Sequence, residues 1–274
     1  MKKKKLLKFF SIALLIVGLT GCSESSIKME ISGSTSVAPL MEKLTSAYTK
    51  KTGEGIVLAA DGSSAGIKAA ASKVSDIGMS SRPLAEDELQ LGLVDYKIAI
   101  DAIGVVVSNE NSISNLTVNQ LHDIFSGKIT NWKELGGFDV PIVLVSRESG
   151  SGTKSAFEET ADLIQEDKSS IVDTLGPIVV NSTGAVIENI SEKKGAIGYI
   201  SVDSVDEKIK LIGVNGIVPN EETISNNQYI LSRDFHLLYM KENTDVKQFI
   251  EYLKSEDGQK EIRNSGFIPG KVEQ

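Results

Sequence analysis

The sequence predicts an α/β fold in two lobes, in which each lobe holds a mixed, mainly parallel sheet flanked by helices. Short β-rich runs alternate with amphipathic helical patterns along the chain, which is typical of sheets covered by helices. Two β-rich runs, at residues 97–107 and 229–240, are unusually long, so we expect them to cross between the lobes as a hinge. The composition, 41% hydrophobic and 24% charged over 274 residues, suits one large or two medium globular domains.

The elements are predicted in order along the chain. A strand at residues 28–32 is followed by a helix over about 36–50, because Val37, Leu40, Met41, Leu44 and Tyr48 recur at helical spacing. Gly53 is the expected stop of that helix. The remaining predicted strands lie at 55–60, 76–79, 97–107, 142–146, 178–180, 196–200 and 230–240, and the remaining helices at 64–73, 117–125, 153–164, 184–191 and 244–264.

The two long strands set the expected lobe boundaries. We place lobe I at residues 28–102 together with 235–274, and lobe II at residues 103–234. A chain that passes twice between two lobes builds a cleft with a hinge.

The N-terminal segment is typical of an export signal. Five lysines lie within the first eight residues and no acid precedes Glu24, and the apolar run that follows, at 9–19, is too short to cross a bilayer. The sequence Leu19-Thr20-Gly21-Cys22 resembles the lipobox of bacterial lipoproteins. We therefore expect residues 1–21 to be a signal peptide, Cys22 to be lipidated and 22–27 to form a tether. The lipid on Cys22 is expected to anchor the chain on the outer face of the cytoplasmic membrane, in a Gram-positive bacterium. The alternative is an ordinary secretory signal with a chance cysteine.

Charge and cysteine content exclude several classes of function. The whole chain has 29 basic and 37 acidic residues, a net charge of −8, and loss of residues 1–21 leaves 24 against 37, or −13. This balance argues against nucleic acid or an anionic membrane surface as the main partner. One cysteine excludes an internal disulfide, and with only His122 and His236 a Cys/His zinc site is not expected. We expect no metal and no cofactor.

Four short runs of glycine and hydroxyl residues stand directly before helical patterns. Each alone is what a helix cap requires, since the side-chain oxygens can accept from the unpaired N–H groups of the first turn. Together, at the carboxyl ends of strands that face one cleft, they supply N–H donors, hydroxyls and positive dipole ends. This pattern predicts an anion site, and the four runs are residues 33–36, 61–64, 149–153 and 181–184.

Arg147 strengthens the prediction of an anion site. It follows an apolar strand and precedes the glycine-rich run, so its guanidinium is expected beside the same helix N-terminus, where it can hold two oxygens of a tetrahedral oxyanion. The alternative is a surface arginine paired with Glu148. A P-loop is excluded because Thr153 precedes Lys154 instead of following it, and a nucleophilic Ser151 would need a base that no histidine context supplies. The site has parts for binding and lacks parts for turnover, so an enzyme is not expected.

Six segments resemble the phosphate-binding lipoproteins of phosphate-specific ABC importers, and they occur in that family's order across the mature chain. The resemblance implies a periplasmic-binding-protein fold of type II that closes on one inorganic phosphate and delivers it to a membrane permease. We expect the chain to be a monomer. The six segments are SGSTSVAPL (32–40), GSSAGIK (62–68), DIGMSSRPL (76–84), IFSGKITNW (124–132), RESGSGT (147–153) and GAIGY (195–199).

The same resemblance implies which residues bind phosphate. Some family members have an aspartate that accepts the proton of bound hydrogen phosphate, where this sequence has Ser81 followed by Arg82. We therefore hypothesise that Asp61, or failing that Glu148, supplies the acceptor, although Asp61 can equally be a cap or turn residue. The implied phosphate ligands are Ser34, Thr35, Ser36, Ser63, Ser81, Arg147, Ser151, Gly152 and Thr153.

Two other interpretations stay open. A binding protein of the same kind could take another tetrahedral oxyanion, such as sulfate or molybdate. A phosphohydrolase or a phosphate-responsive sensor could use the same cradle of N–H groups and hydroxyls.

Overall fold

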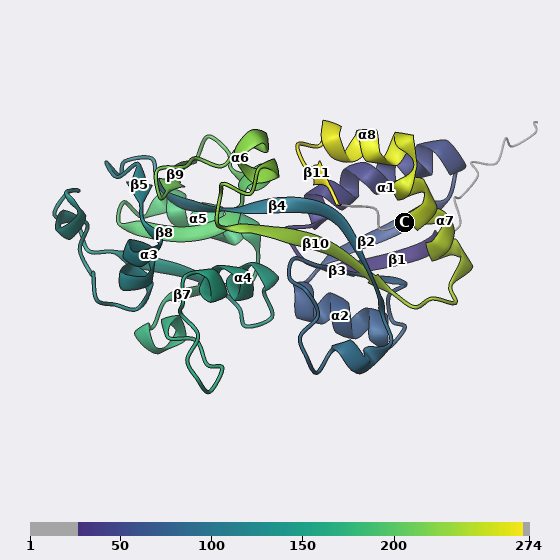
Figure 1. The fold of residues 1–274 in the computed structure, drawn as a ribbon, viewed down its shortest axis with the longest axis horizontal. Helices are drawn as coiled ribbons and strands as arrows, with labels where there is room; N and C mark the ends of the chain where they lie inside the picture. The colour runs from purple at the N-terminus through teal and green to yellow at the C-terminus, as the bar shows by residue number, and fades with distance from the viewer. Residues whose placement is uncertain (1–26, 271–274) are drawn as a thin grey trace, which may run out of the picture.

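The structure, a computed structural model, describes residues 27–270 and arranges them as two α/β lobes side by side (Figure 1). In lobe I, β1 (Ile27–Gly33) pairs in parallel with β2 (Gly55–Ala60) and with β3 (Ile77–Ser80). The antiparallel strand β10 (Ser232–Tyr239) joins β3 to β4 (Val94–Ser108). The short strand β11 (Ile268–Pro269) pairs with β4.

Lobe II continues the same hydrogen-bonded sheet beyond β4. The second half of β4 pairs antiparallel with β8 (Ala196–Ser201) and with β9 (Ile209–Val214). Strand β6 (Val143–Arg147) lies parallel to β8 and to β7 (Ile178–Val180). The two-residue strand β5 (Asn115–Leu116) pairs with β9.

Strand β4 is the crossing element that the sequence predicted. Its residues 94–102 pair with β10, and its residues from Ile103 onward pair with β8, so a single strand belongs to both lobes. Figure 1 shows β4 and β10 running together between the lobes. The predicted two-lobed α/β fold with two crossing strands is confirmed.

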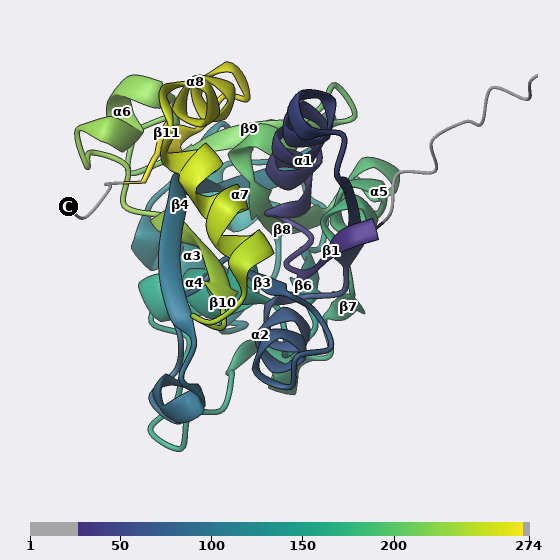
Figure 2. The same ribbon diagram turned by 90° about the vertical axis from the view of Figure 1, so that its right-hand side faces the viewer.

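Helices cover both faces of the sheet. In lobe I, α1 and α8 lie on one side of the sheet and α2 on the other, which Figure 2 shows from the end of the molecule. The α-helices are α1 (Ala38–Thr52), α2 (Ser63–Ala71), α3 (Val118–Phe125), α4 (Gly152–Thr160), α5 (Thr183–Glu192), α6 (Glu221–Ser225), α7 (Thr244–Lys254) and α8 (Glu256–Asn264). The described residues also form four 3-10 turns, at Leu89–Leu91, Trp132–Leu135, Val172–Leu175 and Val202–Ser204.

Most predicted elements are confirmed, and the differences have local causes. Gly53 ends α1 in a left-handed conformation, as expected, with its N–H donating to Thr49 O. The single helix predicted at 244–264 is wrong, because Ser255 is extended and its hydroxyl accepts from Gly258 N to begin a second helix. The helix predicted to reach residue 164 ends at Thr160, and Asp162 has a φ of 55°.

The described residues pack into three hydrophobic cores. One core lies in lobe I and is built from β1, β3, β10 and helices α1, α7 and α8. Lobe II has a core on each face of its sheet, and β4 serves both, because Val105 and Val107 point to one and Val106 to the other. The predicted lobe boundaries stay a prediction.

The predicted signal peptide at 1–21, the lipidation site Cys22 and the tether up to residue 26 lie outside the described residues. Between residues 27 and 270, none of the helices combines the length and the apolar character needed to span a bilayer.

Candidate anion-binding site

Loops from both lobes bring hydroxyl side chains together at the carboxyl ends of five strands. Lobe I contributes the loop after β1, the start of α2 and the end of β3, and lobe II contributes the loops after β6 and β7. Parallel strands end at the same edge of a sheet, so the loops that follow them meet there. The buried polar residues of this cluster, none more than 6% exposed, are Ser34, Ser36, Ser63, Ser81, Arg147, Ser151, Thr153 and Thr183.

The loop after β1 is held in place by a glycine. Gly33 has a φ of 135°, and a Cβ there would lie 2.3 Å from Met79 O on the neighbouring strand β3. Ser34 N then donates to the same carbonyl at 3.0 Å. Only glycine permits this approach, and it directs residues 34–36 over the end of the sheet.

Three serines of lobe I are joined through their hydroxyls. Ser34 Oγ donates to Ser81 Oγ at 3.0 Å, and Ser81 Oγ lies 3.2 Å from Ser63 Oγ. The N–H of Ser81 also donates to Ser63 Oγ, at 3.1 Å. A hydroxyl can both donate and accept, so this group can rearrange its hydrogen atoms around an oxyanion.

The hydroxyls of the two lobes meet directly. Ser36 Oγ lies 2.9 Å from Thr153 Oγ1 and 3.4 Å from Thr183 Oγ1, and Thr183 Oγ1 is 3.3 Å from Thr35 Oγ1. A backbone bond also crosses the cleft, from Ser64 N to Gly150 O at 3.1 Å. The two lobes are therefore in contact at the hydroxyl cluster, and the cleft between them is closed there.

Arg147 is the cation of this cluster. Its side chain is 2% exposed, and its Nε and Nη2 donate to the two carboxylate oxygens of Glu148 at 2.8 and 2.9 Å. Nη2 also donates to Thr35 Oγ1 of the opposite lobe at 3.1 Å. The pair with Glu148 therefore exists, but Arg147 is buried within the cleft and is not the surface residue of the alternative interpretation.

Two of the four hydroxyl runs act as helix caps as well as lining the cluster. Ser151 Oγ accepts from Lys154 N at 3.3 Å and begins α4, and Ser182 Oγ accepts from Ala185 N at 3.2 Å and begins α5. Helices α1 and α2 begin without a side-chain cap. The partial positive charge of these helix N-termini favours an anion at the cluster.

The two candidate proton acceptors differ in position. Asp61 is exposed at the end of its loop, and within residues 27–270 no hydrogen bond joins its carboxylate to the hydroxyl cluster. Partial burial raises the pKa of Asp61 above its ordinary value. Glu148 is half-buried against Arg147, and a Cβ on Gly62 would lie 3.2 Å from its Oε1, so this carboxylate adjoins the loop that leads to Ser63.

Thr183 is a member of the cluster that the sequence analysis did not assign to the phosphate site. Thr183 belongs to the run at 181–184, which the sequence analysis identified as one of four similar glycine and hydroxyl loops. That similarity was the signal from which Thr183 could have been assigned to the site. Arg82, which follows Ser81, is bound away from the cluster: it donates to Glu88 at 2.6 and 2.9 Å and to Ser64 Oγ at 3.0 Å.

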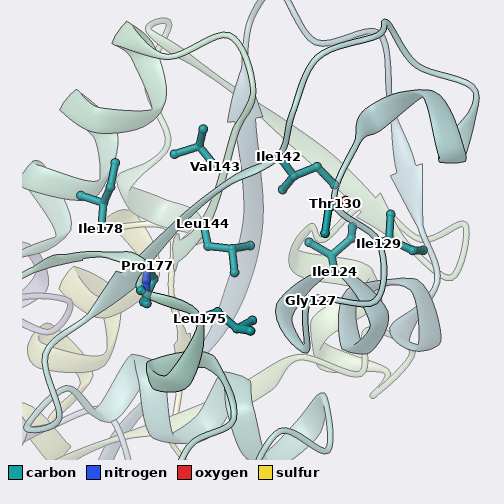
Figure 3. Close-up of a pocket in the computed structure, with 11 residues that line it drawn as sticks. Ile124, Gly127, Ile129, Thr130, Ile142, Val143, Leu144, Leu175, Pro177 and Ile178 are labelled. Atoms are coloured by element: carbon teal, nitrogen blue, oxygen red, sulfur yellow. The ribbon is translucent and has the colours of Figure 1, made fainter.

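A separate hollow on lobe II has a different character. It is an apolar cavity of 340 Å³ between α3, the start of β6 and the turn before β7, and Figure 3 shows Ile124, Leu144 and Leu175 around it. Thr130 is the one polar side chain in its lining and no charged side chain lines it, so the hollow lacks a cation to hold an anion. In the described part of the chain, no group of three or more His, Cys, Asp or Glu side chains is placed to hold a metal ion.

Two lobes that close on a buried polar cluster define a class of protein, the two-lobed binding proteins. Comparison with known proteins agrees, since the family model described as PBP superfamily domain matches residues 22–257. The phosphate-binding protein PstS of Borreliella burgdorferi is 32% identical over 98% of this chain and 99% of its own length. PstS of Bacillus subtilis is 30% identical over 91% of this chain and 83% of its own.

Solved structures narrow the class to a family. A phosphate ABC transporter substrate-binding protein from Clostridium perfringens, solved with bound phosphate, is 39% identical, with a TM-score of 0.83 over 89% of this chain and 99% of that one. An ABC-type phosphate transport receptor from Vibrio cholerae is 38% identical, with a TM-score of 0.72 over 88% and 99%. The chain belongs to the PstS family of phosphate-binding proteins, and the predicted periplasmic-binding-protein fold is confirmed.

Proposed function

We propose that this chain captures inorganic phosphate in the cleft between its lobes and delivers it to the permease of an ABC importer. The observation that carries the proposal is the buried cluster of hydroxyls around Arg147, to which both lobes contribute. The PstS relatives and the C. perfringens structure with bound phosphate support the same ligand.

The proposed ligands divide between the lobes. Lobe I supplies Ser34, Thr35, Ser36, Ser63 and Ser81, and lobe II supplies Arg147, Ser151, Gly152 and Thr153, with Thr183 as an addition. A phosphate that bonds to both sets favours the closed form, because only closure brings them together. Charge-assisted hydrogen bonds such as those from Arg147 contribute about 1.5–3 kcal/mol each.

Binding without turnover is consistent with the positions of the two histidines. His122 Nδ1 lies 3.1 Å from Ala161 O, and His236 Nδ1 lies 2.7 Å from Asp95 Oδ1. In the described part of the chain no hydrogen bond joins either histidine to Ser151, so a nucleophilic Ser151 has no histidine base bonded to it. A phosphohydrolase is therefore the weaker interpretation.

For the proton of bound hydrogen phosphate, Glu148 is a better supported acceptor than Asp61. Glu148 is adjacent to Arg147 and to the loop before Ser63, whereas Asp61 is exposed. A carboxylate that accepts this proton would repel sulfate, which has no proton to offer.

We also propose that Cys22 carries the lipid anchor and that the mature chain acts as a monomer on the outer face of the cytoplasmic membrane of a Gram-positive bacterium. The lipobox-like sequence at residues 19–22 supports this proposal.

The test is a calorimetric titration of the mature chain, residues 22–274, with phosphate and then with sulfate, molybdate and arsenate. We expect saturable binding of one phosphate per chain and no release of phosphate from phosphomonoesters. Tighter binding of sulfate or molybdate than of phosphate would favour the other oxyanion, and phosphatase turnover would contradict a pure binding role.

A further inference from the structure

The crossing strands hold a buried ion pair that the phosphate ligands do not include. Arg233 of β10 lies opposite Asp101 of β4, and its Nε and Nη2 donate to Asp101 Oδ2 at 3.0 and 2.9 Å. The two side chains are only 4% and 2% exposed. Taking both charges out of water is costly, so a buried ion pair is weak evidence for a contribution to stability. The positive charge of Arg233 can therefore have a role other than stabilising the fold.

The pair lies where β4 passes from one lobe to the other. Residue 102 is the last of β4 to pair with β10, and Ile103 pairs with Ser201 at the end of β8. Ser201 Oγ donates to Asp101 Oδ1 at 2.7 Å. Strands β6 and β8 are parallel neighbours, so Ser201 and Arg147, which end them, lie at the same edge of the sheet. The ion pair therefore lies at the edge that carries the anion cluster.

The guanidinium groups of Arg233 and Arg147 repel each other. Burial lowers the pKa of Arg233, Asp101 raises it, and Arg147 lowers it further, whereas the pKa of Asp101 is raised by burial and opposed mainly by Arg233. Arg233 Nη1 is buried and has no hydrogen-bond partner in the described part of the chain. The Nη1 group of this buried cation is thus left without an acceptor there, and the guanidinium carbon lies 5.3 Å from the centre of the Phe235 ring.

We infer that Arg233 is a further affinity-determining residue of the cleft: fixed by Asp101, it places a second positive charge at the sheet edge that carries Arg147, and this charge strengthens the binding of phosphate. This inference rests on the proposed function. An anion beside Arg147 relieves the repulsion between the two guanidinium groups, so Arg233 acts on the anion through its charge. The competing interpretation is that the pair only ties β4 to β10.

The two interpretations differ in the sign of two substitutions. Arg233→Gln and Asp101→Asn break the same ion pair, but the first removes a positive charge and the second a negative one. With charges separated by several ångströms at the effective dielectric constant of a protein, we expect Arg233→Gln to weaken phosphate binding about tenfold and Asp101→Asn to strengthen it about threefold. Arg233→Lys keeps the charge and is expected to bind within about threefold of the wild type.

A matched control lies on the same two strands. Asp234 pairs with Lys97 at 2.8 Å and both are partly exposed, so Asp234→Asn makes the same change of charge outside the buried pair. Phosphate titrations of the mature chain at low and high salt complete the design. Salt screens a buried charge little, so the effects of the substitutions at residues 101 and 233 on phosphate affinity persist at high salt. At high salt, Asp234→Asn is expected to leave the phosphate affinity unchanged.

The outcomes separate cleanly. Equal weakening by Arg233→Gln and Asp101→Asn, or no change in either, overturns the inference. Should Arg233→Gln fail to fold, as judged by circular dichroism, Asp101→Asn decides alone, because tighter binding supports the inference and weaker binding overturns it. A wild-type chain that binds no phosphate contradicts the proposed function and this inference together, whereas a binding wild type with the wrong signs contradicts only the inference.

Discussion

The backbone of Gly152 in lobe II lies directly against the hydroxyl of Ser63 in lobe I. A Cβ at residue 152 would be 2.6 Å from Ser63 Oγ and 2.7 Å from Ser81 Oγ, distances that real Cβ atoms do not adopt. Gly152 is the first residue of α4, so the N-terminus of that helix reaches the serine cluster only because the side chain is absent. Closure of the cleft and the approach of this helix to an anion thus depend on one glycine.

Gly152→Ala is expected to weaken phosphate binding at least about tenfold. The added methyl displaces the serine hydroxyls or holds the lobes apart, and either change lengthens hydrogen bonds to the anion. Calorimetric titration measures the effect. Gly184→Ala is the matched control, because it adds the same methyl near the N-terminus of α5 with nothing within 4 Å of the new Cβ. Equal losses in the two variants would show that the close contact at Gly152 is unimportant.

Arg147→Met is expected to weaken phosphate binding about 100-fold, since it removes charge-assisted hydrogen bonds in a buried site. Arg147→Lys should recover only part of the loss, because an ammonium cannot reproduce the planar fork. Arg82→Met serves as the control, as Arg82 follows Ser81 in sequence but is bound to Glu88, away from the hydroxyl cluster. A loss in Arg82→Met as large as that in Arg147→Met would indicate a general effect of charge and contradict a direct contact.

The proton acceptor can be identified by competition between phosphate and sulfate. We expect Glu148→Gln to reduce the preference for phosphate over sulfate and Asp61→Asn to leave it intact, because Glu148 adjoins Arg147 whereas Asp61 is exposed. The ratio of the two dissociation constants is the quantity to measure, since freeing Arg147 from Glu148 alters the affinity for both anions. Loss of preference in Asp61→Asn alone would assign the acceptor to Asp61.

The parts of the fold that repeat a simple period could be predicted from sequence. Helix α1 and strand β4 follow from apolar residues at helical spacing and from a long β-rich run. Strands β5 and β11 have two residues each and α6 has five, so no period can develop in them. The break at Ser255 was missed because it depends on one side chain, the serine hydroxyl that accepts from Gly258 N and begins the new helix.

Only some of the residues at the site could be predicted from the sequence. Arg147 and the hydroxyl loops share a local pattern, so their meeting at one sheet edge could be expected. The pairing of Asp101 with Arg233 joins residues 132 positions apart and depends on how two strands align, which no local pattern encodes. Contacts that depend on the alignment of two distant strands, such as this ion pair, could therefore not be predicted from residue types alone.

Glu158 makes stability depend on pH near neutrality. It is buried on α4, 3.9 Å from Lys154 Nζ, and burial raises its pKa to about 7 although Lys154 opposes the shift. The folded chain therefore binds a proton between pH 4.5 and 7 that the unfolded chain has released, and stability falls as pH rises through this range. Glu158→Gln removes this ionisation. Between pH 4 and pH 8, we expect the free energy of unfolding of the wild type to fall by up to about 3 kcal/mol relative to that of Glu158→Gln. Urea unfolding at both pH values measures the change, with the exposed Glu159→Gln as control. A wild-type chain whose stability does not fall relative to Glu158→Gln between pH 4.5 and 7 would contradict this assignment.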